Sequence, residues 1–157
     1  MNKVLILGSN SFAGSCYVDH LLNNKYQVYG VSRSKERKIA KYKFNKNIKN
    51  FKFIKADINK NIGVFKKLIL ENKFKYIVDF LGQGMVAESW ENPQDWLKTN
   101  ITSKTELVNF LLNKKFLKKY IRISTPEVYG SSSAKMDEKK SYNPSTPYAI
   151  THMTIDK

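Results

Sequence analysis

The chain has 157 residues, of which 41% are hydrophobic and 13% aromatic, a composition typical of a globular protein rather than a disordered one. This length suits a single domain. The single cysteine, Cys16, excludes an internal disulfide bond. The sequence has no apolar run near the roughly 18 residues that span a membrane, and the short run that ends at Gly8 does not suit a signal peptide. We therefore expect a cytoplasmic protein without membrane contact.

The formal net charge of +15 raises the alternative of nucleic-acid binding. The cations are almost all lysines spread along the chain, with Arg33, Arg37 and Arg122 as the only arginines. The densest stretch, residues 35–55, also carries aromatic rings on which bases could stack. A solvated helix leading into a buried strand explains this stretch better, and we expect no nucleic-acid partner.

Apolar runs of strand length alternate with helical patterns along the whole chain. The first strand, residues 3–7, is followed by a helix over 12–22, in which we expect Cys16 to be a small core residue. The other predicted strands are 27–32, 51–56, 76–81 and 120–124, and the other predicted helices are 60–72, 93–112 and a last one beginning at Tyr148. This alternation predicts right-handed crossovers and a parallel sheet. We therefore predict an α/β, Rossmann-like, doubly wound parallel sheet with helices on both faces, formed by residues 1–157 as one nucleotide-binding domain.

Glycines at the end of the first strand form a pattern that binds dinucleotides. Gly8 and Gly14 fit the outer positions of a G-x-x-G-x-x-G turn, where the first glycine permits the tight bend and the last lets helix and strand pack closely. Ser11 stands at the middle position, nearest to the pyrophosphate, and its hydroxyl could bond a phosphate oxygen. With Phe12 opening the helix, these residues form the predicted phosphate-binding turn.

The end of the second strand distinguishes the two nicotinamide cofactors. An acidic residue there binds the ribose 2′-hydroxyl of NAD, whereas arginine accommodates the 2′-phosphate of NADP. Here Arg33 stands between Ser32 and Ser34, with no carboxylate. We predict NADP as the cofactor; NAD, with Arg33 as an ordinary surface cation, is the alternative.

Five further blocks follow the glycine turn, with Asn100 among them: residues 56–58, 80–84, 86–93, 124–130 and 144–149, which read ADI, FLGQG, VAESWENP, STPEVYG and PSTPYA. Together they resemble the extended short-chain dehydrogenase/reductases, the NAD-dependent epimerase/dehydratase family, and within it the nucleotide-sugar 4,6-dehydratases. The resemblance implies that Asp57 holds the adenine and that Gln83 lines the cofactor. The further cofactor-binding residues that it implies are Ile58, Leu81, Gly82, Asn100, Ser124, Tyr148 and His152.

The resemblance also implies a reaction on a nucleotide sugar through transient oxidation at C4, with hydride transfer to the nicotinamide and no metal. Tyr148 would be the base that removes the 4-hydroxyl proton, which requires its pKa to fall by about three units from the usual value near 10. Family members have a lysine four residues further on, where this chain has His152. Imidazole is mostly neutral at pH 7 and helps less; an ordinary helix histidine is the alternative.

Two residues of the STPEVYG block complete the implied catalytic set. Thr125 would hydrogen-bond the sugar O4, and Glu127 would be the base at C5. Pro126 stands where many 4,6-dehydratases have the acid, and it has no side-chain proton to give. The resemblance to 4,6-dehydratases makes dehydration the main expectation. Because Pro126 cannot act as the acid, epimerisation and decarboxylation are the alternatives.

The chain ends at Lys157, soon after the predicted tyrosine helix begins. Family members continue with further strands and a smaller C-terminal domain that holds the nucleotide sugar, and they commonly form homodimers. We therefore expect a C-terminally truncated chain that lacks the substrate domain, binds cofactor and turns over little. A non-catalytic cofactor-binding protein is the alternative.

Overall fold

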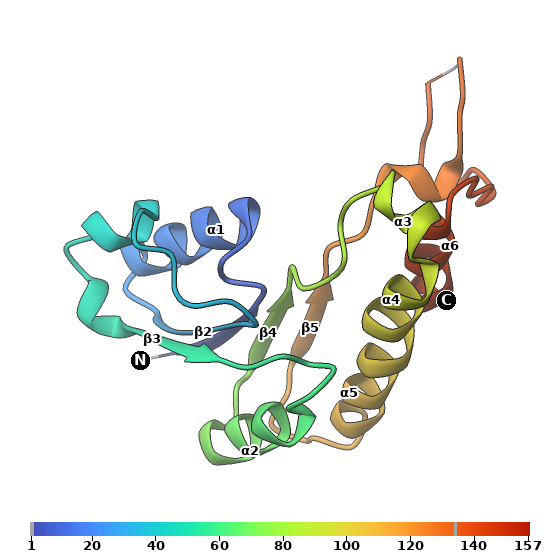
Figure 1. Cartoon of the computed structure of the whole chain (residues 1–157). Helices are drawn as coiled ribbons and strands as arrows, with labels where there is room; N and C mark the ends of the chain where they lie inside the picture. Colours follow the sequence, from blue (N-terminus) through green and yellow to red (C-terminus); the bar gives the residue numbers. More distant parts are fainter. Residues whose placement is uncertain (1, 134) are drawn as a thin grey trace. The chain divides into compact units, whose positions relative to one another are not determined.

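The computed structural model describes residues 2–133 and 135–157. It divides into two compact units (Figure 1). The first comprises the chain up to Leu81 together with Leu107–Ile123, and the second comprises Gly82–Glu106 together with Ser124–Lys157. The first unit contains the sheet, and the second contains the helix that carries Tyr148.

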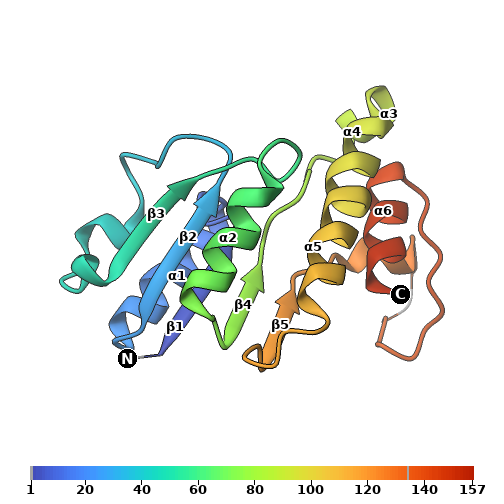
Figure 2. The ribbon, with the colours of Figure 1, turned by 90° about the horizontal axis from the view of Figure 1, so that it is seen from below.

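The first unit is built on a five-stranded, all-parallel sheet. Its strands are β1 (Lys3–Leu7), β2 (Gln27–Ser32), β3 (Phe51–Lys55), β4 (Tyr76–Asp79) and β5 (Lys119–Arg122). They follow one another in the order β3-β2-β1-β4-β5, as Figure 2 shows. The chain thus starts at the middle strand, moves to one edge and then crosses to the other. This confirms the predicted Rossmann-like sheet, although β3, β4 and β5 end one or two residues earlier than predicted.

Successive residues of the central strand β1 face two separate hydrophobic clusters. Leu5 lies in a cluster with the buried face of α2 (Ile62–Asn72), whereas Ile6 lies in a cluster with the buried face of α1 (Phe12–Asn23). Because side chains along a strand point alternately to opposite faces, these two helices cover opposite sides of the sheet (Figure 1). The predicted doubly wound arrangement is confirmed.

One prediction within α1 is wrong, because Cys16 is exposed. Phe12, one turn earlier, is also exposed, with 82% of its surface accessible. Residues four apart share a helix face, so these two residues form one stripe, and that stripe lies on the solvent side. Gly14 instead approaches the carbonyl of Gly8 closely, which turns the stripe of Gly14 and Val18 toward the sheet.

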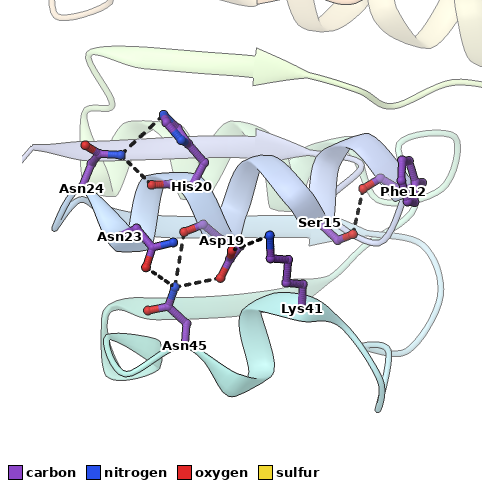
Figure 3. A network of polar contacts seen from close by, with 8 residues as sticks. All are labelled: Phe12, Ser15, Asp19, His20, Asn23, Asn24, Lys41 and Asn45. Carbon is purple, nitrogen blue, oxygen red and sulfur yellow. Dashed lines mark hydrogen bonds and ion pairs between the residues drawn. The ribbon is translucent and has the colours of Figure 1, made fainter.

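The lysine-rich connection between β2 and β3 forms two single 3₁₀ turns, η1 (Lys41–Phe44) and η2 (Ile48–Asn50), and not the predicted solvated helix. Tyr42 is fully buried in it. Asn45 ties the connection to α1, because its side-chain nitrogen donates to Asp19 Oδ1 at 2.8 Å (Figure 3). The buried ring of Tyr42 and the buried amide of Asn45 therefore hold this connection against the first unit, although its many charges indicate a solvated segment.

The second unit is helical. Its elements are α3 (Glu88–Glu91), α4 (Pro93–Trp96), the π-helical segment η3 (Leu97–Thr102), the first turn of α5 (Ser103–Leu111), the 3₁₀ turn η4 (Pro126–Tyr129) and α6 (Pro147–Asp156). Helical structure thus runs from Pro93 to Leu111, close to the prediction, with Pro93 in the first turn. α6 packs against α4, η3 and η4. In the part of the chain that the structure describes, no helix is both long and apolar enough to cross a membrane.

Candidate functional site

The predicted cofactor residues of the first unit lie where the strands end. The glycine turn follows β1, Arg33 follows β2, and Asp57 comes two residues after β3. Since all strands run in the same direction, these loops leave the sheet at its carboxyl edge. Ligands of open parallel sheets bind at this edge.

The bend of the turn requires glycine at both predicted outer positions. Gly8 has a φ of +77°, which favours glycine, and an added Cβ would lie 2.7 Å from the carbonyl carbon of Phe80. At Gly14 an added Cβ would collide with the carbonyl oxygen of Gly8. Both obstacles are main-chain atoms, so a side chain at either position would displace the backbone.

Ser11, at the middle position, is the N-cap of α1. Its Oγ accepts a hydrogen bond from the amide of Gly14 at 3.0 Å, which leaves the hydroxyl hydrogen for another acceptor. The amides of Phe12 and Ala13 belong to the first turn, where N–H groups have no acceptor within the helix. The turn therefore offers N–H and O–H donors at the positive end of a helix, which suits a phosphate.

Asn10 joins this turn to the segment after β2. Its Nδ2 donates to Ser34 Oγ and to the carbonyl of Lys35, each at 2.8 Å. Its main-chain nitrogen donates to Ser32 Oγ at 2.9 Å. Arg33, within this anchored segment, is exposed and forms no ion pair with a residue that the structure describes. Its guanidinium is therefore available to an anionic ligand.

The loop after β3 places Asp57 half-buried at the same edge of the sheet. Its Oδ1 accepts a hydrogen bond from the amide of Asn59 at 2.9 Å, which orients the carboxylate. The side chain of Ile58 is buried in the hydrophobic cluster that faces α2, so only the main chain of this predicted residue can meet a ligand.

A buried carboxylate shapes the exit from β4. Asp79 Oδ1 accepts from the amide of Leu81 at 2.7 Å, and its Oδ2 accepts from the Tyr120 hydroxyl at 2.6 Å. Burial, together with this carboxylate, raises the pKa of Tyr120 far above its ordinary value. The phenol therefore remains a donor, and the pair fixes the position of Leu81.

In the second unit, the main chain of Tyr148 is held from two sides. Its amide donates to Ser89 Oγ of α3 at 3.2 Å, and its carbonyl accepts from Thr151 Oγ1 at 2.8 Å. Thr146 caps the helix by accepting from the amide of Ala149 at 3.1 Å. Because Pro147 has no N–H, every amide of residues 147–149 is accounted for. The start of α6 is thus fixed by hydrogen bonds.

Asn100 extends this network. It is fully buried in the π-helical segment, and its Nδ2 donates to Thr151 Oγ1 at 3.1 Å. Its Oδ1 accepts from the amide of Gln83 at 2.9 Å, and its Nδ2 also donates to the carbonyl of Gln83 at 3.2 Å. An added Cβ at Gly82 would lie 3.1 Å from the same Oδ1, which leaves little room for a side chain. Three predicted cofactor residues, Gly82, Gln83 and Asn100, are thereby brought together.

His152 lies beside Tyr148. Their ring centroids are 4.6 Å apart with planes tilted by 52°, and only 8% of the His152 surface is exposed. The imidazole is therefore a buried neighbour of the tyrosine and not a surface histidine.

The remaining predicted catalytic residues lie in and next to η4, which packs against α6. Thr125 is the N-cap of η4, and its Oγ1 accepts from the amide of Glu127 at 3.3 Å. Pro126 occupies the first helical position, where no N–H is needed. Ser124 Oγ donates to Asp156 Oδ2 of α6.

Sequence reasoning missed three residues that hold the site. Asn10, Ser89 and Thr151 are buried, and each hydrogen-bonds a segment that carries a predicted site residue. The position of Thr151, three residues after Tyr148, could have suggested a bond to the helix carbonyl. The partners of Asn10 and Ser89 are too distant along the chain for any local signal.

No cluster of three or more metal-ligating side chains occurs in the described ranges 2–133 and 135–157.

The residues of the glycine turn fit a dinucleotide. Gly8 and Gly14 keep side chains out of the bend. Asn10 Oδ1 is buried and has no hydrogen-bond partner among the described residues. A buried amide oxygen without a donor is unfavourable, and the ribose hydroxyls of a nucleotide are donors of the missing kind.

Comparisons with known proteins agree with this geometry. The family model for GDP-mannose 4,6 dehydratase matches residues 5–157. A dTDP-D-glucose 4,6-dehydratase of Mus musculus is 30% identical, and the match covers 94% of this chain and 42% of that protein.

Solved structures give the same family. The UDP-Glc/GlcNAc 4-epimerase of Campylobacter jejuni has a TM-score of 0.87 at 28% identity, covering 99% of this chain and 47% of that chain. A UDP-glucuronic acid 4-epimerase of Bacillus cereus, in complex with UDP-glucuronic acid and NAD, has a TM-score of 0.78 at 26% identity, covering 98% and 50%. The chain spans about half the length of these relatives. The resemblance inferred from the sequence is confirmed: the chain belongs to the nucleotide-sugar dehydratase and epimerase family described by the GDP-mannose 4,6 dehydratase model.

Proposed function

We propose that this chain forms the nucleotide-binding part of a nicotinamide-dependent enzyme of the 4,6-dehydratase type that acts on a nucleotide sugar. The observation that carries the proposal is the arrangement of Tyr148, whose main-chain nitrogen and oxygen are both held by buried side chains. A side chain that takes a proton in a reaction must be placed before the substrate arrives, and such anchoring does this. Relatives that are named 4,6-dehydratases support the reaction type.

In this proposal Tyr148 removes the proton of the sugar 4-hydroxyl, and Thr125 hydrogen-bonds the oxygen. A nicotinamide bound at the carboxyl edge of the sheet would supply the acceptor for the hydride of C4. The ring of His152 lies against the phenol ring of Tyr148, with centroids 4.6 Å apart, and borders the place where the proton is taken. Glu127 would then take the proton from C5 and give it to the departing 6-hydroxyl, which leaves as water; the hydride returns to C6, and C5 takes up a proton.

We propose NADP as the preferred cofactor. Arg33, Lys35, Arg37 and Lys38 are all exposed in the segment after β2. The one acid of that segment, Glu36, is engaged by Lys43 at 2.7 Å and does not neutralise Arg33. NAD, which is bound in the Bacillus cereus epimerase, is the alternative.

Epimerisation is the second candidate reaction. Pro126 begins η4, so no acidic side chain stands between Thr125 and Glu127 to protonate a leaving hydroxyl. Oxidation at C4 followed by return of the hydride to the other face needs no acid at this position. Several of the similar solved structures are 4-epimerases.

Thermal unfolding of the 157-residue chain with NADP, with NAD and without ligand tests the cofactor site. A ligand at 100 times its dissociation constant stabilises the folded state by about 2.7 kcal/mol. We expect a clear rise in Tm with NADP, a smaller one with NAD, and loss of the difference in Arg33→Ala. No shift with either cofactor would overturn the proposal.

Mass spectrometry of reaction mixtures with GDP-mannose, dTDP-glucose and UDP-glucose separates the two reactions. Dehydration gives a product that is one water lighter, whereas epimerisation leaves the mass unchanged and alters the chromatographic position. Tyr148→Phe is the control, because it keeps the ring and removes only the hydroxyl. Product formation that survives in Tyr148→Phe would contradict the assigned base.

A further inference from the structure

We propose that Asn10 determines the preference for NADP by holding the segment Ser32–Lys35 in the conformation that presents Arg33 to a ribose 2′-phosphate. This inference rests on the proposed function, since it concerns the cofactor that the proposal assigns. Asn10 acts here as a positioning residue: its side chain fixes the segment, and the guanidinium of Arg33 meets the phosphate.

The contacts of Asn10 surround Arg33 on both sides. The main-chain nitrogen of Asn10 donates to Ser32 Oγ, before the arginine. The Asn10 amide group donates to Ser34 Oγ and to the carbonyl of Lys35, after it. Asn10 engages the hydroxyls of Ser32 and Ser34 and only the carbonyl of Lys35, so the side chains of Arg33 and Lys35 both extend into solvent.

Ser32 is also held by the sheet, because its carbonyl accepts from the amide of Ala56 at 3.0 Å, but the residues after it have little else to hold them. Between the buried residues Ser32 and Ala40, no residue is buried. Glu36 anchors the later part through Lys43 and the Tyr42 hydroxyl. The conformation of residues 33–35 depends on hydrogen bonds from Asn10. Asn10 is itself only 8% exposed and lies in the glycine turn.

This arrangement links two binding elements that are far apart in the sequence. The glycine turn binds the pyrophosphate, and the anchored segment binds the group on the 2′ position of the same adenosine. An arginine that is already placed loses less conformational freedom on binding, so anchoring increases affinity for the 2′-phosphate. Without the anchor, the segment must be ordered by the ligand itself.

The test uses a pair of ligands that differ only in the 2′-phosphate: adenosine 2′,5′-bisphosphate and 5′-AMP. Both represent the adenosine half of the cofactor, so their binding depends on the first unit. Dissociation constants are measured by calorimetry for the wild-type chain, Arg33→Ala, Asn10→Ala, Ser34→Ala and Lys38→Ala. The quantity compared is the ratio of the two affinities, because a general disturbance of the turn lowers both.

We expect the wild type to prefer the bisphosphate and Arg33→Ala to lose most of that preference. Asn10→Ala should reduce the ratio about three- to tenfold, the effect of losing one or two hydrogen bonds. Lys38→Ala removes an exposed cation that lies three residues beyond the segment and that Asn10 does not contact, and it should change the ratio less. Ser34→Ala removes an acceptor of Asn10 from an exposed residue and should lower the ratio in the same direction.

The outcomes distinguish the NADP assignment from the role of Asn10. A wild-type chain without preference for the bisphosphate overturns the NADP assignment and this inference with it. A wild-type preference that Arg33→Ala abolishes and Asn10→Ala leaves intact overturns the role of Asn10 alone. If Asn10→Ala does not fold, Ser34→Ala decides, and an unchanged ratio in that variant overturns the inference.

Discussion

Ser89 Oγ accepts a hydrogen bond from the main-chain nitrogen of Tyr148 at 3.2 Å and donates one to the carbonyl of Val86 at 2.6 Å. Ser89 is completely buried, and Tyr148 lies in the first turn of α6, where its amide has no acceptor within the helix. One hydroxyl therefore connects the loop before α3 to the helix that carries the candidate base.

Ser89→Ala should destabilise the start of α6. The change leaves the Tyr148 amide and the Val86 carbonyl without their partner, at a cost of about 1–3 kcal/mol. Hydrogen exchange should become faster at the Tyr148 amide than in the wild type, while β1 amides stay protected. Ser145→Ala, at an exposed serine in the loop before α6, is the control. Equal exchange at Tyr148 in both variants would refute the role assigned to Ser89.

Asn100→Ala should have a larger effect, because Asn100 donates and accepts in the same buried network. It removes hydrogen bonds to both main-chain groups of Gln83 and to Thr151. We expect a loss of about 2–4 kcal/mol in the free energy of unfolding, measured by urea denaturation. Asn113→Ala, at an exposed position, should stay within about 0.5 kcal/mol of the wild type. A similarly small effect at Asn100 would show that water replaces the network.

Asn45→Ala should release the connection between β2 and β3 from α1. The buried Asn45 side chain donates to Asp19 Oδ1 at 2.8 Å and to Asn23 Oδ1 at 3.0 Å (Figure 3). We expect a loss of about 1–3 kcal/mol on urea unfolding. Lys41→Ala should lose much less, because its ion pair with Asp19 spans 3.7 Å and the lysine is 74% exposed. Comparable losses in the two variants would contradict this ranking.

Tyr42 should make the stability of the first unit sensitive to high pH. Burial, and then the carboxylate of Glu36, raises the pKa of Tyr42 to about 12. The unfolded chain ionises this phenol near pH 10, so above that pH the folded state binds more protons than the unfolded state. The contribution of Tyr42 is therefore fully present below about pH 10 and is lost as the pH rises toward about 12. Urea unfolding across this window should show a steeper loss for the wild type than for Tyr42→Phe; parallel losses would contradict the assignment.

The strands and the glycine turn could be predicted from local patterns. A short apolar run ending in glycine gave β1 and its turn, because burial on both faces and a tight bend restrict the residue types directly. Pro93 likewise marked the start of a helix, since proline at the first position costs no hydrogen bond. The motif around Tyr148 identified α6 from the same kind of local information.

Burial within α1 could not be predicted in this way. The helix pattern favours a core position for Cys16, yet Cys16 is exposed, as is Phe12 one turn earlier. The close approach of Gly14 to the carbonyl of Gly8 sets the rotation of the helix about its axis, and this packing outweighs the hydrophobicity of two side chains. The segment after β2 differs from its prediction for a similar reason, because Tyr42 and Asn45 find partners on other elements.

The sequence by itself determined the parallel sheet, the glycine turn after β1 and the family, because each depends on residue types at short spacing. Only the tertiary structure decided which residues hold the site in place. Asn10 meets Ser34 across 24 residues, Asn100 meets Thr151 across 51, and Ser89 meets Tyr148 across 59. Such bonds depend on the alignment of strands and the rotation of helices, which packing sets after the local elements have formed. The physical reason is that a hydrogen bond needs its two atoms within about 3 Å, and spacing along the chain does not specify that distance.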